Sequence, residues 1–260
     1  MSKWSSYYLI RIEFLGFRYH GWQKQVKLKT IQGMVDKTFK FVLGHDNFKT
    51  LGCGRTDAKV SADDFVFELF LDEFSDELFL MNRLNSELPS DIRVTSVKET
   101  SADFNIIQHP KIKEYHYYFS FGAKNHPFAA SLLVGFQENL DIEIMKKGAK
   151  LFEGIHYFHK YCTEPTKETV FKREIISCAI EENDILTANF FPKTSYVLKV
   201  QGNGFLRYQI RLMMGVLVEL GKHEKPLDYI IDSLKENNDR KFLRNIVPGS
   251  GLQLYHIEFK

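Results

Sequence analysis

Apolar and polar residues alternate in short stretches along the first part of the chain, which is the pattern of half-buried strands. Strands are expected at residues 7–14, 48–54, 64–71 and 91–99. Between these strands, apolar residues recur with helical spacing at residues 30–44 and 75–89. The predicted order is strand, helix, strand, strand, helix, strand, which is the ferredoxin-like arrangement.

The second part of the chain repeats this pattern more loosely. Strands are expected at residues 113–122, 172–182, 194–204 and 254–260, and helices at 141–154, 205–223 and 226–237. The helix at 205–223 is the longest and most apolar of the predicted helices. We therefore expect an α+β protein with two ferredoxin-like halves and a central mixed or antiparallel sheet, divided into domains 1–102 and 103–260.

The bulk composition indicates an ordinary globular protein. The chain has 260 residues, of which 44% are hydrophobic, so it can bury a substantial core. Its three cysteines, Cys53, Cys162 and Cys178, are too few and too scattered for a disulfide framework, and no pair has the spacing of metal ligands. The short apolar run at residues 7–10 is interrupted at once by Arg11. We expect a cytoplasmic protein with no structural metal, no signal peptide and no membrane span.

Charge is distributed unevenly, although the formal net charge is only +2. Residues 1–30 carry six basic side chains and one acidic side chain, a formal charge of +5. Residues 63–103 carry eleven acids and three basic side chains, a formal charge of −8. Such asymmetry is typical of a protein that presents a basic face to a polyanion, and two solvated surfaces would explain it equally well.

The stretch GCGRTDAKVSA at residues 52–62 places Asp57 in the turn between two predicted strands. For an isolated acid in such a turn, a structural cap is the ordinary explanation. Six further motifs accompany it: YHGWQKQ (19–25), TIQGMVD (30–36), LNSELPSDI (84–92), KEYHYY (113–118), NGFLRYQIRLMMG (203–215) and GLQL (251–254). In this order the motifs resemble those of the TruA family of tRNA pseudouridine synthases over nearly the whole chain. Each motif alone is weak, and the ordered set is specific.

The resemblance implies a pseudouridine synthase fold with an active-site cleft. It implies an enzyme that isomerises uridine to pseudouridine in the anticodon stem-loop of tRNA, at family positions 38–40. This reaction breaks a C–N glycosidic bond and forms a C–C bond at the same sugar, so it needs no cofactor and no metal. The resemblance implies that Asp57 attacks the base or the anomeric carbon, or helps to remove the 2′ proton, and these routes remain open.

The resemblance also implies roles for further residues. Arg211 would keep the Asp57 carboxylate ionised, since a carboxylate in a closed pocket otherwise tends to become protonated. Tyr115 would stack on the target base and relay a proton, although an inward-facing strand aromatic is a serious alternative. Leu252 and Leu254 would form an apolar wall of the pocket, and for them this role and a core role cannot be separated.

RNA contacts are expected from a set of basic and polar side chains: Arg18, Lys24, Lys27, Lys29, Arg55, Lys111, Lys113, Asn203 and Arg207. Individually, each of these charges is more often simply solvated. The expected partners are the anticodon arm of tRNA and a second copy of the chain in a homodimer. The sequence departs from the family pattern at Lys59, where a glycine is expected, and at Ile107, where an arginine is expected, so the chain is interpreted as a divergent TruA-like paralogue.

Two other classes of function remain open. A non-catalytic RNA-binding or tRNA-folding protein with a TruA-like fold is favoured only by Ile107 and Lys59. A hydrolase with an aspartate nucleophile would need a second acid opposite Asp57 as general acid, and no acid in the motifs is an evident candidate.

Overall fold

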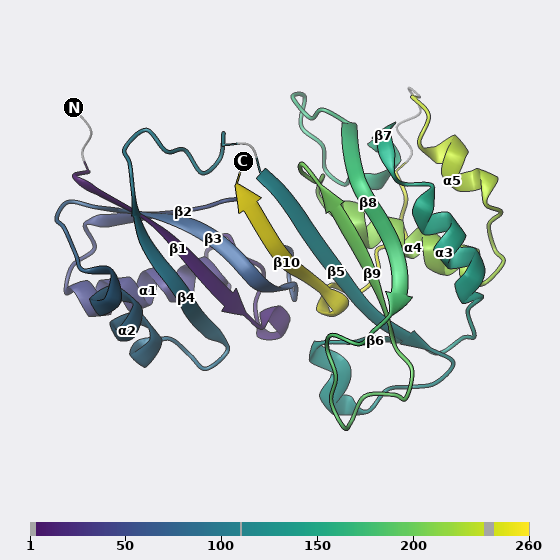
Figure 1. Cartoon of the computed structure of the whole chain (residues 1–260), viewed down its shortest axis with the longest axis horizontal. Coiled ribbons are helices and arrows are strands. Elements are labelled where there is room, and N and C mark those ends of the chain that lie inside the picture. The colour runs from purple at the N-terminus through teal and green to yellow at the C-terminus, as the bar shows by residue number, and fades with distance from the viewer. Residues whose placement is uncertain (1–3, 110, 237–241, 260) are drawn as a thin grey trace. The chain divides into compact units, whose positions relative to one another are not determined.

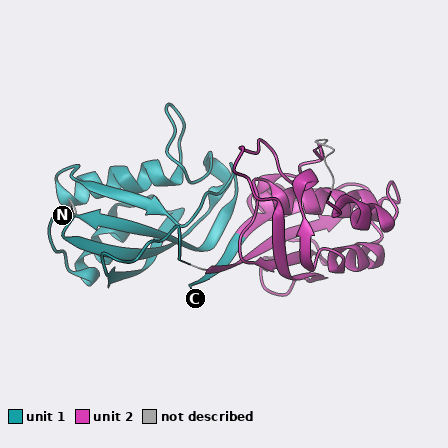
Figure 2. Ribbon diagram, turned by 90° about the horizontal axis from the view of Figure 1, so that it is seen from above, with its two compact units in different colours: residues 1–110, 254–260 teal, residues 111–253 magenta. Residues whose placement is uncertain are grey.

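A computed structural model of the chain describes residues 4–109, 111–236 and 242–259. The chain divides into two compact units, which are residues 1–110 with 254–260 (unit 1) and residues 111–253 (unit 2), as Figure 2 shows. The expected domains were 1–102 and 103–260. The units differ from them chiefly at the end of the chain, because Ile257 N in the last strand donates to Asp64 Oδ2 of unit 1 at 3.0 Å.

Unit 1 is a sheet with two helices. Its elements are β1 (Ser6–Phe14), η1 (Gly16–Arg18), α1 (Ile31–Leu43), β2 (Phe48–Gly52), β3 (Ser61–Leu71), α2 (Glu77–Glu87) and β4 (Ile92–Thr100). β1 pairs antiparallel with β4 and β3, and β2 pairs antiparallel with β3. The resulting order β4-β1-β3-β2 (Figure 1) confirms the ferredoxin-like arrangement that the sequence predicts.

The core of unit 1 is rich in aromatic side chains. Phe39 of α1 packs against Phe67 of β3 with their ring centroids 6.2 Å apart, and Trp22 lies 4.2 Å from Phe65 of β3. Thr30 caps α1 by accepting from Gly33 N at 3.2 Å, and the helix ends at Gly44 in a left-handed conformation. The apolar face predicted at residues 30–44 is therefore the face that packs on the sheet.

Unit 2 also contains paired strands and helices. Its elements are β5 (Lys111–Phe121), η2 (Pro127–Ser131), β6 (Val134–Phe136), α3 (Ile142–Lys150), β7 (Gly154–Tyr157), η3 (His159–Tyr161), β8 (Lys172–Glu182), β9 (Tyr196–Gly202), α4 (Gln209–Gly221), α5 (Asp228–Ser233) and η4 (Gly249–Gly251); β10 (Leu252–Phe259) begins here and continues in unit 1. β9 pairs antiparallel with β5 and β8, β8 with β7, and β6 runs parallel to β5. The chain thus has the mixed α/β architecture expected from its sequence.

Helix α4 forms the centre of unit 2. Nearly all of its residues are buried, which is the property of a helix that is apolar on every side. It packs against α3 at Gly148, where a Cβ atom would lie 2.5 Å from Leu220 Cδ2. The expected helix at 226–237 corresponds to the shorter α5, and residue 237 lies outside the described residues. None of the described helices is both long enough and apolar enough to span a bilayer.

Candidate active site

Asp57 lies in the loop between β2 and β3, and backbone hydrogen bonds hold this loop against the segment that follows β1. Trp22 N donates to Thr56 O at 3.3 Å. Lys59 N donates to Tyr19 O at 3.0 Å. These bonds lie on either side of Asp57, so the position of its carboxylate depends on a segment far away in the sequence.

Gly21 makes a very close approach to the Asp57 loop. Its φ of +83° lies in the left-handed region that favours glycine. A Cβ atom at this position would lie 2.3 Å from Thr56 O and 3.1 Å from the carbonyl carbon of Asp57. Only glycine therefore allows the YHGWQKQ and GCGRTDAKVSA motifs to meet without displacing the peptide that joins Thr56 to Asp57.

The Trp22 side chain supports the start of the same loop. Its indole is buried and packs against the Phe65 ring. A Cβ atom on Gly52, the last residue of β2, would lie 2.5 Å from Trp22 Nε1, so this position needs glycine to admit the ring. An aromatic pair of this kind contributes about 0.5–1.5 kcal/mol beyond the burial of its surface.

Tyr19 connects the Asp57 loop to a third motif. Its hydroxyl donates to Asp91 Oδ1 at 2.8 Å, and Arg18 Nη2 donates to Asp91 Oδ2 at 2.6 Å. Burial, together with the hydrogen bond to Asp91, raises the pKa of Tyr19, so this hydroxyl remains a donor across the physiological pH range. Asp91 belongs to LNSELPSDI, so three motifs of unit 1 meet around the loop that carries Asp57.

In unit 2, Tyr115 and Arg211 come from β5 and the first turn of α4. The Tyr115 ring is 9% exposed and packs edge-on against Phe205, with the ring centroids 5.2 Å apart. Arg211 Nε donates to Val247 O at 2.8 Å, and its guanidinium lies 4.7 Å from the centre of the Tyr208 ring. These contacts fix the direction of the arginine side chain before any ligand binds.

The start of β5 and the loop before α4 carry three of the residues expected to contact RNA. Lys113 pairs with Gly202 at the end of β9, directly before Asn203. Asn203 Nδ2 donates to Glu174 Oε2 at 2.6 Å. Arg207 forms an ion pair with Glu164. The start of β5, the end of β9 and the loop before α4 therefore place basic and amide groups at one end of the unit 2 sheet.

Leu252 and Leu254 open β10 and are 5% and 1% exposed. Gly251, which precedes them, would bring a Cβ atom to within 2.8 Å of Tyr118 O, so the GLQL motif lies tightly against β5. Burial is what both a pocket wall and an ordinary core residue require, so the role of the two leucines stays a prediction.

The basic side chains expected on unit 1 lie at its surface. Arg18 is bound to Asp91, Lys24 Nζ donates to Asp36 Oδ2 at 2.7 Å, and Lys29 Nζ lies 4.8 Å from the centre of the Tyr19 ring. Lys27 and Arg55 are exposed, whereas Lys111 is half-buried in β5 of unit 2. Asp91 and Asp36 are only 9% and 18% exposed, whereas Arg18 and Lys24 are 58% and 63% exposed and remain open to a further anion.

The two departures from the family pattern differ in kind. Lys59 has φ of +66°, the left-handed conformation that the expected glycine would adopt without strain, and its ammonium lies 5.5 Å from the centre of the Phe17 ring. The side chain of Ile107 is 54% exposed in the segment that follows β4. Lys59 thus changes the strain of the loop, and Ile107 changes the surface.

Sequence reasoning did not select Asp91, Tyr208 or Val247. Asp91 could have been found from its place in the motif LNSELPSDI. Tyr208 lies in NGFLRYQIRLMMG and its ring lies 4.7 Å from the Arg211 guanidinium, so its motif was an available signal as well. Nothing in the sequence marks Val247, because it acts through its carbonyl oxygen, which every residue carries.

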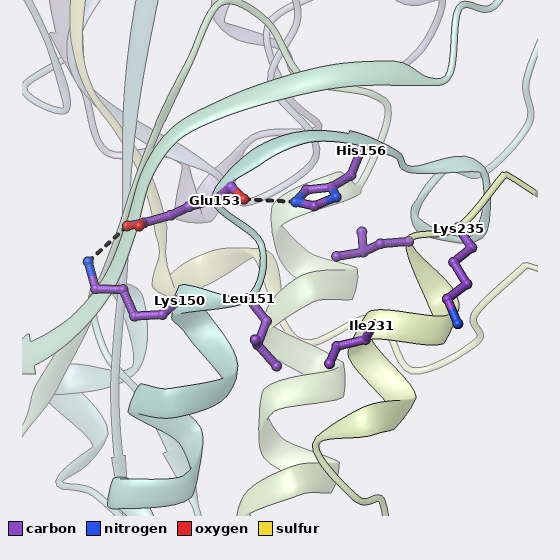
Figure 3. A pocket seen from close by; sticks show the side chains of 7 residues that line it. Lys150, Leu151, Glu153, His156, Ile231 and Lys235 are labelled. Carbon is purple, nitrogen blue, oxygen red and sulfur yellow. Dashed lines mark hydrogen bonds and ion pairs between the residues drawn. The ribbon is translucent and has the colours of Figure 1, made fainter.

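A separate hollow of about 390 Å³ lies in unit 2 beside α3 and α5 (Figure 3). Lys150 Nζ donates to Glu153 Oε1 at 2.8 Å, and His156 Nε2 donates to the Glu153 carbonyl at 2.7 Å. The hollow contains none of the expected site residues. Among the described residues, no group of three or more His, Cys, Asp or Glu side chains is placed to hold a metal ion.

Comparison with known proteins gives these motifs a family. A family model described as tRNA pseudouridine synthase matches residues 149–260. The chain is 30% identical to tRNA pseudouridine synthase A 2 of Bacillus thuringiensis subsp. konkukian over 253 residues, which cover 97% of this chain and 99% of that protein. It is 29% identical to tRNA pseudouridine synthase A 1 of Protochlamydia amoebophila, covering 97% and 96%, and 30% identical to tRNA pseudouridine synthase A of Aquifex aeolicus, covering 82% and 84%.

The fold, the supported Asp57 loop and these matches define a protein of the pseudouridine synthase class. Because the identity reaches 30% over almost the full length of both chains, the assignment can be narrower. The chain belongs to the tRNA pseudouridine synthase A family. A crystal structure of a Cbf5-Nop10-Gar1 complex aligns with 81% of this chain and 54% of that chain at 14% identity and a TM-score of 0.29, which is too low to support an argument.

Proposed function

We propose that this protein isomerises uridine to pseudouridine in the anticodon stem-loop of tRNA. The observation that carries the proposal is the loop of Asp57, which the YHGWQKQ motif holds through two backbone hydrogen bonds and the close approach of Gly21. A solvated turn acid would not require such support. The full-length matches to proteins named tRNA pseudouridine synthase A favour the same reaction and tRNA as the substrate.

In this proposal Asp57 is the catalytic carboxylate. It attacks the base or the anomeric carbon, or assists removal of the 2′ proton, and the proposal leaves these routes open. Arg211 keeps the carboxylate ionised and Tyr115 stacks on the target base. The support for these roles is their position in the family motifs, together with the contacts that orient Arg211 and Tyr115 within unit 2.

Substrate binding has to offset the cost of turning the uridine out of its stack. That cost is a few kcal/mol and is least in loops and at helix ends. The exposed cations of unit 1 and the polar loop before α4 are the proposed phosphate ligands. We further propose a homodimer in the cytoplasm that binds one anticodon arm per active site, without a metal or a cofactor.

The test compares the full chain with the variant Asp57→Asn on an unmodified tRNA transcript. Carbodiimide labelling followed by mass spectrometry counts pseudouridine and locates it in the RNA. We expect no pseudouridine from Asp57→Asn, because the amide lacks the charge and nucleophilicity of the carboxylate, while folding and tRNA affinity stay close to those of the unaltered protein.

Residual turnover by purified Asp57→Asn would refute the catalytic role of Asp57. An unaltered protein that binds tRNA without forming pseudouridine would favour the non-catalytic RNA-binding alternative. A product outside the anticodon stem-loop would retain the reaction and overturn the proposed substrate position.

A further inference from the structure

Arg173, near the start of β8, is a half-buried arginine whose charge has no acidic partner among the described residues. Its Nη1 donates to the carbonyl of Lys172 at 3.5 Å, which is a long and weak hydrogen bond. Its Nε is buried and has no hydrogen-bond partner in the described part of the chain. Burial lowers the pKa of Arg173, because it penalises the charged form.

Other arginines of the chain have acidic partners. Arg11, Arg18 and Arg207 each bind a carboxylate. A guanidinium removed from water without an anion is costly, and it cannot lose its proton in the physiological range. An anion that binds this guanidinium during function would supply the missing partner and offset that cost.

The strand register places Arg173 on the face of the sheet that carries Tyr115. Tyr115 pairs with Val200 of β9, and Gly202, two residues further on, pairs with Ile175 of β8. Directly paired residues project to the same face, as do residues two positions apart in a strand. Arg173 is two positions before Ile175, so it projects to the face of Tyr115.

A ring contact supports this placement. A Cβ atom on Gly202 would lie 3.2 Å from Phe205 Cζ and 3.6 Å from Ile175 Cδ1, so the Phe205 ring covers this part of the face. The same ring packs edge-on against Tyr115. Arg173 therefore lies beside the part of unit 2 that the proposed function assigns to the target base.

Thr163 carries a second polar group without a partner in the described part of unit 2. Thr163 Oγ1 is buried and makes no hydrogen bond to the described residues. Thr163 N donates to Arg207 O at 3.3 Å, which ties its loop to the loop before α4. The Cys162 thiol, adjacent in sequence, interacts electrostatically with both Arg173 and Arg207, although burial is the larger effect and raises its pKa. Thr163 therefore directly follows a residue whose thiol lies within electrostatic reach of Arg173.

Two carboxylates adjacent in sequence to Thr163 and Arg173 are already engaged. Glu164 is bound by Arg207, and Glu174 accepts from Asn203 Nδ2 at 2.6 Å. In addition, Glu174 is the next residue after Arg173 in β8, so its side chain projects to the opposite face of the strand. Neither carboxylate is a partner of Arg173, so its guanidinium is available to an external anion.

We propose that Arg173 and Thr163 bind a phosphate of the RNA backbone beside the base that stacks on Tyr115. This inference rests on the proposed function, since that function makes RNA the substrate. The planar guanidinium presents parallel N–H groups to two oxygens of the phosphate. The hydroxyl of Thr163 donates to an oxygen of the same phosphate. A half-buried arginine is already restricted in its rotamers, so less conformational freedom is lost on binding.

The test uses Arg173→Met in the full chain with an unmodified tRNA transcript. We expect about tenfold weaker binding, which is the effect of losing one charged hydrogen-bonded contact. The dependence of log affinity on log salt concentration should become shallower by about one unit, because one phosphate contact is lost. The free energy of unfolding should not fall, since no charge is left buried without a partner.

Three further variants distinguish a specific phosphate-binding site from a general effect of positive charge. Lys172→Met removes the same charge from the neighbouring, solvent-exposed position and should leave both affinity and salt dependence nearly unchanged. Arg173→Lys keeps the charge but not the planar fork, so it should keep the salt dependence and lose a few-fold in affinity. Thr163→Val should weaken binding a few-fold without changing the salt dependence.

Unchanged affinity and salt dependence in Arg173→Met would overturn the inference, as would equal effects of Lys172→Met and Arg173→Met. Arg173 would instead have a structural role under two conditions. Arg173→Met would be much less stable than the unaltered protein while Arg173→Lys regained that stability, and neither variant would change RNA binding. RNA binding is measured without turnover, so the two proposals can fail separately. If the unaltered protein formed no pseudouridine, the proposed function would be refuted, and the salt dependence of binding would still decide whether Arg173 binds a phosphate.

Discussion

The variant Gly21→Ala tests whether the Asp57 loop depends on a close backbone approach. Two costs are added by the new methyl group. The first is backbone strain, because an L residue at φ of +83° costs about 1–2 kcal/mol relative to glycine. The second is steric, because the Cβ atom would lie 2.3 Å from Thr56 O, whereas ordinary contacts begin at 3.4 Å.

Relief of the steric contact requires a movement of about 1 Å between the backbone of Gly21 and the peptide that joins Thr56 to Asp57. A displacement of about 1 Å at a reacting group costs on the order of 100-fold in rate. Overpacking of this kind also costs about 1–3 kcal/mol of stability. We therefore expect kcat/KM for pseudouridine formation to fall on the order of 100-fold.

Gly44→Ala is the matched control. Gly44 has φ of +76°, so an alanine there carries nearly the same backbone strain, but no atom lies within 4 Å of its Cβ position. Initial rates on an unmodified tRNA transcript give kcat/KM. Tryptophan fluorescence in urea reports on unit 1, because the chain's two tryptophans, Trp4 and Trp22, both lie in that unit and so do both glycines.

Gly44→Ala should lose about 1–2 kcal/mol of stability and keep its activity. Gly21→Ala should lose more stability than Gly44→Ala and lose the activity as well. If the two variants were equally stable and equally active, the close approach of Gly21 to Thr56 would have no bearing on the position of Asp57.

Three further outcomes are expected. Lys59→Gly should raise the free energy of unfolding of unit 1, measured in urea, by about 0.5–1 kcal/mol, because the relief of left-handed strain exceeds the added entropy of the unfolded chain. Lys59→Ala keeps the strain and should not raise this free energy. Arg211→Ala should abolish pseudouridine formation and also lower the melting temperature, since the bond to Val247 O is lost, in contrast to the stable Asp57→Asn. Sedimentation at micromolar concentration should show a dimer, and a single 30.4 kDa species would contradict the proposed assembly.

Much of unit 1 could be predicted because its elements carry long periodic patterns. The predicted strand at 64–71 nevertheless begins at Ser61, since Ala62 pairs with Phe14 beyond an irregularity in β1 that periodicity does not reveal. The strands β6 and β7 have three and four residues, which is too short for an alternating pattern to be recognised. The pairing of the last strand with unit 1 depends on contacts across almost the whole chain, such as Ile257 with Asp64.

The candidate site was predictable only where the chemistry belongs to a residue type within a motif. Asp57, Tyr115 and Arg211 fall into that group, and their catalytic roles stay proposals. Arg173 had no such signal, because one arginine in a strand is indistinguishable in sequence from an arginine that is paired or solvated. Its distinguishing property is the lack of a described acidic partner at a half-buried position, which exists only in the folded unit.

The contacts of unit 1 explain why individually weak motifs are informative as a set. Tyr19 of YHGWQKQ donates to Asp91 of LNSELPSDI, and Gly21 of the first motif contacts the Thr56 peptide of GCGRTDAKVSA. A substitution in one motif is therefore tolerated when it preserves the backbone geometry on which the others depend. Lys59 meets this condition, because it keeps the left-handed conformation that glycine would adopt there. Departure from the family pattern at this position costs some stability and leaves the support of Asp57 in place.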